Sequence, residues 1–130
     1  MTFAERLARA QQISGSLVCV GLDPDPAKLP KDLAEPDALR GAQAPFASAE
    51  PLYAFNRRIV DATAGIAAAY KPQIAFYSAL GAEDQLVASI RYIRERAPAA
   101  LSFWMPSATT SAIPPRLMLA RRSIGTVPMR

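Results

Sequence analysis

Ser16-Leu-Val-Cys-Val-Gly-Leu22 is a continuous apolar run that stops at Asp23-Pro-Asp-Pro26. The run is short, contains β-branched residues and shows no polar alternation, which is typical of a parallel strand buried on both faces. Within such a strand, Cys19 is expected to be a small buried hydrophobic residue. This stretch therefore predicts the first strand of a parallel α/β protein.

A helix is predicted on the N-terminal side of this strand and a loop on its C-terminal side. Thr2 and Glu5 fit a capping box, and apolar residues recur behind them at helical spacing to about Gln12. Residues 26–51 are rich in proline, alanine and charge, which predicts a long loop with one helical turn.

Two more helices and a second strand are predicted downstream. The strand covers about residues 70–77, although Pro72 removes one backbone donor from it. One helix has an apolar stripe of Phe55, Ile59, Ala62 and Ile66, flanked by Val60 and Ala67. The other begins at Glu83 and Asp84 and has the stripe Leu86, Val87, Ile90 and Ile93. The order helix, strand, loop, helix, strand, helix predicts two successive βα units.

The chain changes character near residue 100. All 11 acidic residues precede that point, together with 11 of the 15 basic ones. Residues 101–130 contain four arginines and no acid: Arg116, Arg121, Arg122 and Arg130. We therefore divide the chain into residues 1–98 and an irregular basic tail, residues 99–130. The net charge of +4 is confined to that tail, which argues against nucleic-acid binding by the rest of the chain.

Several functional classes are disfavoured by composition. The chain has no histidine, the commonest general base and metal ligand, and its single cysteine excludes a disulfide framework and a cysteine metal site. Gly21 and Gly81 stand alone, so no glycine-rich phosphate loop is present. We read no signal peptide and no membrane-spanning run, so a cytoplasmic protein is expected.

Charged residues fall where the predicted strands end, which is where parallel α/β proteins gather functional groups. Asp23 and Asp25 follow the first strand, and Lys71 lies in the second. A turn made by Asp and Pro, and a lysine that extends its ammonium to solvent, are the structural alternatives. An acid and a lysine at neighbouring strand ends can also form a charge-assisted pair facing a ligand. The aromatic residues of this segment are expected in the core or at its rim: Tyr70, Phe76 and Tyr77.

Three strings carry a family resemblance: SLVCVGLDPDPAKLP (Ser16–Pro30), FNRRIVDATAGIAAAYKPQIAFYSALGAE (Phe55–Glu83) and YIRERAP (Tyr92–Pro98). Together they resemble the N-terminal part of the bacterial type 2 orotidine 5′-phosphate decarboxylases. Ser78 departs from the glutamate that the family has after the Phe-Tyr pair, which affects a local contact.

The resemblance implies a fold and a function. The family is a cofactor-free, homodimeric (β/α)8 TIM barrel that converts orotidine monophosphate to UMP and CO2, without nucleic-acid or membrane partners. This chain would hold an N-terminal helix and the first two βα units of an incomplete barrel. Asp23 would help to hold the ribose, and Lys71 would join the charged network beside it.

The family's catalytic lysine belongs to a third-strand motif, DAKRxDIG, which these 130 residues lack. A displaced reading frame permits it, as shown by joining the last base of each codon with the first two of the next. Trp104 and Met105 must then give Asp, and Met105 and Pro106 must give Ala. From Leu101 onward the displaced frame permits VILDAKRxDIG, as if one base had been lost, or two gained, near codons 98–100.

The sequence thus predicts a decarboxylase fragment that stops before the catalytic lysine and is inactive as written, with no catalytic residue, cofactor or metal. Three alternatives stay open. The tail can be a genuine divergent C-terminus. The chain can be a small non-catalytic protein whose basic tail binds an acidic partner or nucleic acid. It can also belong to another phosphate-handling barrel of the same superfamily.

Overall fold

The computed structural model of the chain describes residues 1–30, 33 and 51–103. Most of the loop predicted over residues 26–51, and the tail beyond residue 103, lie outside the described residues. The described elements are α1 (Phe3–Ser14), β1 (Cys19–Leu22), the 3-10 helix η1 (Pro26–Lys28), α3 (Pro51–Thr63), β2 (Ala69–Pro72), α4 (Ile74–Ala79), α5 (Glu83–Arg96) and β3 (Leu101–Ser102).

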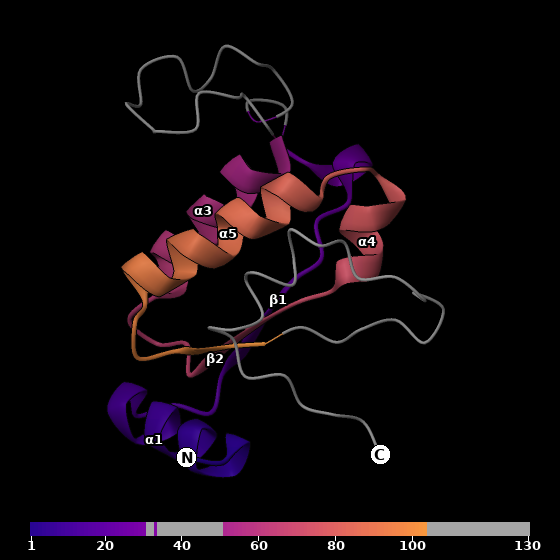
Figure 1. Cartoon of the computed structure of the whole chain (residues 1–130). Helices are drawn as coiled ribbons and strands as arrows, with labels where there is room; N and C mark the ends of the chain where they lie inside the picture. Colours follow the sequence, from indigo (N-terminus) through magenta and orange to yellow (C-terminus); the bar gives the residue numbers. More distant parts are fainter. Residues whose placement is uncertain (31–32, 34–50, 104–130) are drawn as a thin grey trace.

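The described strands form a parallel three-stranded sheet in the order β1-β2-β3. Helices α3 and α5 pack side by side over one face of this sheet, and α1 lies on the other (Figure 1). The α/β class expected from the sequence is confirmed. A small parallel three-stranded sheet is also compatible with part of a barrel.

The third strand was not expected, because residues beyond about 100 show neither helical nor strand periodicity. Leu101 nevertheless donates its N–H to the carbonyl of Ala68 (2.9 Å), and Phe103 donates to Tyr70 (3.1 Å). Leu101 is buried with Ala10 of α1. A sheet edge pairs through backbone groups, so a strand needs little side-chain pattern to add to it. This is also the position where the displaced frame reads VILD.

The helical layer is attached to the sheet by a buried cluster of apolar side chains. Its members come from β1, β2, α3, α5 and the segments flanking β2 and β3: Leu22, Val60, Ala67, Tyr70, Ile93 and Ala97. Tyr70 and Ile93 are completely buried, so the second strand and the last helix share one core. Apolar burial of this kind is the main contribution to the stability of the fold.

Helices α1 and α5 follow the sequence closely. Thr2 Oγ1 accepts from the Glu5 N–H (3.2 Å) and Glu5 Oε2 accepts from the Thr2 N–H (2.7 Å), which completes the predicted capping box. Helix α1 ends at Gly15, whose left-handed φ of 61° favours glycine. Helix α5 begins at Glu83, as expected, and buries Leu86, Ile90 and Ile93 of its predicted stripe.

The predicted buried face of the α3 segment is only partly right, because the flanking Val60 and Ala67 are buried but most of the stripe itself is not. The structure buries the row Leu52, Asn56 and Val60, while Ile66 lies beyond the end of α3 and is 55% exposed. The row includes a polar residue, Asn56, whose amide finds hydrogen-bond partners on α4 and α5. A count of apolar residues alone cannot anticipate such a satisfied polar group in the core.

The predicted strand over residues 70–77 is also wrong in its second half. Strand β2 ends at Pro72, and Ile74–Ala79 form the short helix α4. Ile74 and Tyr77, three residues apart, both pack into the cluster with α3 and α5, whereas Phe76 is 47% exposed. A short apolar run fits either a strand or one helical turn, and the packing decides between them.

The first strand is not buried on both faces. It covers only Cys19–Leu22, and Cys19 is exposed rather than a buried hydrophobic residue. The preceding residues are also open to solvent, with Leu17 81% exposed. Since β1 is the first strand in the sheet order, no described strand covers its outer edge.

A cluster of hydrogen bonds and ring contacts joins the outer surfaces of α3 and α5. Asp61 Oδ1 accepts from the Tyr92 hydroxyl (2.7 Å) and from Arg96 Nε (2.9 Å). The guanidinium of Arg57 lies 4.9 Å from the centre of the Tyr92 ring. The Tyr92 hydrogen bond is the main cause of a lowered pKa of Asp61, and Arg96 adds to it.

The lowered pKa predicts a pH dependence. A carboxyl group whose pKa is lower in the folded state stabilises the fold above its unfolded pKa of about 3.9, and the contribution disappears as the pH falls through the folded pKa. We expect Asp61→Asn to reduce the helical signal that survives a fixed urea concentration at pH 7, with little difference from the unmodified chain near pH 2. Circular dichroism measures this. Glu95→Gln, on the exposed side of α5, is the control, and an equal loss there would contradict the assignment.

Candidate functional site

The carboxyl ends of β1 and β2 meet at one edge of the sheet. The register pairs Gly21 with Lys71 and Leu22 with Pro72, and Asp23 follows directly. The structure therefore brings Asp23 and Lys71 to the same ends of adjacent parallel strands, as the sequence predicted. Their role in binding stays a prediction.

Asp23 and Lys71 sit close together in the sheet but do not bond to each other. The exposed Asp23 places Oδ2 3.6 Å from the position that a Cβ on Gly21 would occupy, and Gly21 is the register partner of Lys71. Lys71 is half-buried, and among the described residues neither side chain forms an ion pair. Both charged groups are therefore available to a polar ligand at this edge.

Cys19 lies on the same face of the sheet as Lys71, because alternate residues of paired parallel strands share a face. Although the Cys19 side chain is exposed, the surrounding protein atoms partly desolvate its thiol and raise its pKa, and the Lys71 ammonium acts in the opposite direction. The thiol is thus held in its neutral form at neutral pH. Nothing in this arrangement makes it a nucleophile.

A tyrosine that sequence reasoning placed only in the core or at the rim reaches the end of β1. Tyr77 is 1% exposed, and its hydroxyl donates to the carbonyl of Leu22 (2.8 Å). It accepts from Asn56 Nδ2 (2.9 Å), which also donates to Ser89 Oγ (2.8 Å). The available signal was an asparagine at helical spacing from Leu52 and Val60. Ser78, the departure from the family pattern, is the next residue of α4 and is half-buried.

Burial raises the pKa of Tyr77 to about 12, and the nearby Asp23 carboxylate acts in the same direction. The Tyr77 hydroxyl therefore stays protonated throughout the physiological range and can always donate to Leu22. The described edge thus combines one carboxylate, one ammonium group and one fixed hydroxyl. These groups can bind and orient a polar or anionic ligand.

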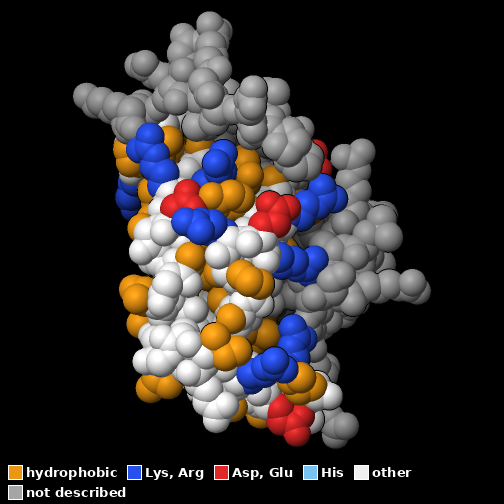
Figure 2. All heavy atoms as spheres, turned by 90° about the vertical axis from the view of Figure 1, so that its left-hand side faces the viewer, with side chains coloured by type: hydrophobic (Ala, Val, Ile, Leu, Met, Phe, Trp, Pro, Cys, Tyr) orange, Lys and Arg blue, Asp and Glu red, His pale blue; other side chains and the backbone are white. Residues whose placement is uncertain are grey.

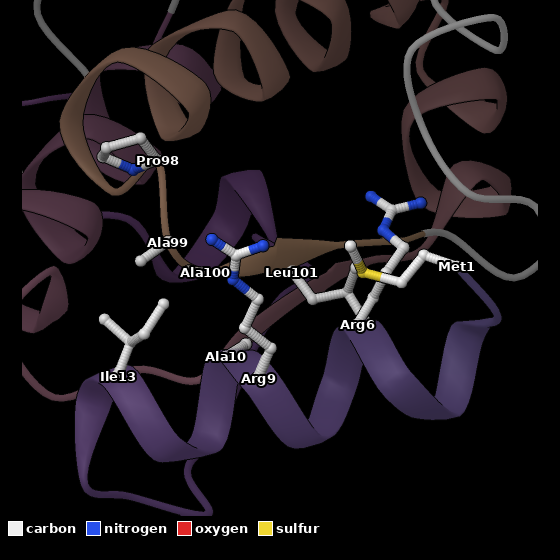
Figure 3. Close-up of a pocket in the computed structure, with 9 residues that line it drawn as sticks. All are labelled: Met1, Arg6, Arg9, Ala10, Ile13, Pro98, Ala99, Ala100 and Leu101. Atoms are coloured by element: carbon white, nitrogen blue, oxygen red, sulfur yellow. The ribbon is translucent and has the colours of Figure 1, made fainter.

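A hollow of about 450 Å³ lies between α1 and the segment that leads into β3 (Figure 3). The side chains of Arg6 and Arg9 rise from α1 on the side that faces this segment. The lining residues are Met1, Arg6, Arg9, Ala10, Ile13, Pro98, Ala99, Ala100 and Leu101. Neither Asp23 nor Lys71 is among the described residues that line this hollow.

The distribution of charged side chains on the surface is relevant to the alternative that the protein binds an acidic partner or nucleic acid. On the face drawn in Figure 2, basic side chains alternate with acidic ones and with hydrophobic ones rather than forming one continuous patch. The four arginines that motivated this alternative lie beyond residue 103, outside the described residues. In the part of the chain that the structure describes, no helix has the length and apolar character needed to cross a membrane.

The fold and this edge define a class: an α/β protein with its candidate site at the carboxyl ends of parallel strands. Comparison with known proteins then finds proteins of similar sequence. The chain is 50% identical over 98 residues to the orotidine 5′-phosphate decarboxylase of Variovorax paradoxus, which covers 75% of this chain and 31% of that protein. The enzymes of Ralstonia nicotianae and Cupriavidus necator are 47% and 48% identical over the same length, covering 75% of this chain and 32% of each.

The matched part of the chain is therefore homologous to the orotidine 5′-phosphate decarboxylases. The chain spans about a third of the length of these relatives. No family model matches it. No solved structure matches it either.

Proposed function

We propose that this chain is the N-terminal part of an orotidine 5′-phosphate decarboxylase, with Asp23 and Lys71 contributing to the substrate site. One observation carries the proposal. The two charged residues that the family resemblance selects lie at the same edge of adjacent parallel strands, within a segment homologous to these enzymes. Such an edge is where a barrel of this architecture places its substrate.

The two residues have complementary roles in the proposal. The Asp23 carboxylate accepts hydrogen bonds from the ribose hydroxyls, and the Lys71 ammonium belongs to the charged network around the substrate. Charged groups that the protein holds in position before the reaction usually make the largest contribution to stabilising the transition state. This suits a decarboxylation that needs no cofactor. In this proposal the intact protein is a cytoplasmic homodimer with a complete (β/α)8 barrel.

The 130 residues as written lack the DAKRxDIG motif, so we propose that this polypeptide alone does not decarboxylate. The displaced frame beginning at Leu101 supports the loss of one base near codons 98–100. Returning that base would place the motif on the strand that occupies the β3 position. We call the product of that correction the frame-restored chain.

The proposal is tested by removing each charge from the frame-restored chain. Asp23→Asn and Lys71→Ala are each expected to lower kcat/KM for orotidine monophosphate by about 10- to 100-fold, because a charged hydrogen bond contributes about 1.5–3 kcal/mol. Steady-state kinetics measure the effect.

Asp25→Asn and Lys28→Ala are matched controls from the adjoining 3-10 helix. Asp25 caps that helix by accepting from the Ala27 N–H (3.0 Å), and it forms a surface ion pair with Lys28 (3.4 Å). Exposed pairs contribute little, so both controls should stay within about twofold of the unmodified activity. Equal losses in the site and control variants would refute the site.

A further inference from the structure

A network of hydrogen-bonded polar side chains lies within the apolar core and reaches Leu22, the residue before Asp23. Its three side chains come from three different helices, and all are fully buried: Asn56 of α3 at 0%, Tyr77 of α4 at 1% and Ser89 of α5 at 2% exposed. Buried polar groups destabilise a core unless they are hydrogen-bonded. An arrangement that spans three helices therefore calls for an explanation beyond packing.

The hydrogen bonds of this network lead outward from the Asn56 amide in two branches, one through Tyr77 and one through Ser89. Ser89 Oγ donates its proton to the carbonyl of Gln85 (2.8 Å), so it can only accept from Asn56. Tyr77 donates its proton to the carbonyl of Leu22, so it also accepts from Asn56. The Asn56 amide uses both of its N–H groups in this way, which holds the Tyr77 hydroxyl toward β1.

Placing Asn56 in the core leaves one of its polar atoms without a hydrogen bond to a described residue, which is energetically unfavourable. Its Oδ1 is buried and has no hydrogen-bond partner among the described residues. An unsatisfied buried acceptor is unfavourable, and an apolar side chain at this position would avoid it. The contribution of Asn56 therefore lies in the donors that hold Tyr77 and Ser89.

The Tyr77 branch of the network ends at the peptide group between Leu22 and Asp23, which leads into the candidate site. The Leu22 carbonyl and the Asp23 N–H belong to the same rigid peptide plane. The Asp23 side chain is exposed and has no hydrogen bond or ion pair with another described residue. The contact from Tyr77 thus constrains the backbone that aims the Asp23 carboxylate.

We propose that Tyr77, held by Asn56 and Ser89, is a positioning residue that orients Asp23 for binding the substrate ribose. This inference rests on the proposed function, since it assigns Asp23 to the substrate site. The network acts through Asp23 and touches no reacting atom. Its effect is to reduce the conformational freedom of the substrate-binding carboxylate before the ligand arrives.

The decisive experiment is a double-mutant cycle in the frame-restored chain. Tyr77→Phe removes only the hydroxyl and is expected to lower kcat/KM by about tenfold. In an Asp23→Asn background the same change should have almost no further effect, because the carboxylate that it positions is gone. A general loss of packing would instead lower both backgrounds equally, and that additive result would overturn the proposal.

Tyr70→Phe is the matched control. Tyr70 is also a fully buried tyrosine, but its hydroxyl pairs with Thr63 Oγ1 (2.9 Å) and not with the end of β1. This variant should leave kcat/KM within about twofold while removing a partly buried hydroxyl hydrogen bond. A tenfold loss from Tyr70→Phe would show that any buried hydroxyl matters equally, which also contradicts the positioning role.

A second measurement separates this inference from the proposed function. Leu-Asp occurs once in the 130 residues, at Leu22–Asp23, so carbonyl-13C leucine with 15N aspartate gives one resonance pair in an NMR spectrum of the dilute chain. Tyr77→Phe should shift this pair and Tyr70→Phe should not. An inactive frame-restored chain with this shift present would contradict the proposed function alone. An unmoved resonance would overturn the positioning network whatever the activity.

Discussion

Returning one base near codons 98–100 is expected to convert an inactive 130-residue polypeptide into a decarboxylase. The polypeptide as written should show no turnover of orotidine monophosphate above background, because the charged network of the DAKRxDIG motif is absent from it. The frame-restored gene should allow a strain that requires uracil to grow without it. Growth of the strain and the decarboxylation rate of the two purified products are measured. The frame-restored product should be active, and the 130-residue polypeptide should show no activity.

The control for this rescue lies in the restored motif itself. Changing its lysine to alanine should abolish growth, since the proton for the carbon that loses CO2 would have no donor. Growth supported by the unrepaired 130-residue chain would show that the tail has a function of its own and that the fragment interpretation is wrong. Failure of the repaired gene would point to further lesions or to a coincidental frame match, and sequencing the downstream region separates these.

The same two products should differ in cooperativity of unfolding. In the described part of the chain, β1 and β3 are the edge strands of a three-stranded sheet, and unpaired edges and uncovered apolar side chains favour aggregation. Several large apolar side chains are exposed: Ile13, Leu17, Val18, Ile66, Phe76 and Leu80. We therefore expect the 130-residue chain to aggregate on heating and to melt without a cooperative transition.

The frame-restored chain should melt sharply, because the added strands would pair both edges of the sheet. Calorimetry with light scattering compares the two. Leu17→Lys, at a site 81% exposed and next to an open edge, should slow aggregation of the 130-residue chain without restoring cooperativity. A sharp two-state melt of a monomeric 130-residue chain would show that this fragment is an independent domain.

Local sequence signals predicted much of the fold. The capping box of α1, the acidic start of α5 and its apolar stripe all arise within a few residues of each other, so they were predicted correctly. The parallel pairing of β1 and β2 was predicted from the alternation of strands and helices. The position of Asp23 and Lys71 at one edge follows from that topology.

Other features depend on contacts distant in sequence. The apolar run after Pro72 fits a strand equally well, and it forms α4 because Ile74 and Tyr77 then meet α3 and α5. Asn56 faces the core because Tyr77 and Ser89 accept its N–H groups, 21 and 33 residues away. The exposure of Cys19 follows from its place in an edge strand, which a local pattern of apolar residues does not encode.

The sequence by itself determined the α/β class, the similarity of a 98-residue segment to the orotidine 5′-phosphate decarboxylases, the two charged residues at the strand ends and the lack of a DAKRxDIG string. Each of these depends on short-range patterns or on residue identity. Only the tertiary structure decided which face of α3 is buried, that residues 101–102 add a third strand, and that Tyr77 contacts the carbonyl before Asp23. Those features depend on which distant groups satisfy each other's hydrogen bonds and fill the same space, and one-dimensional periodicity carries no information about that.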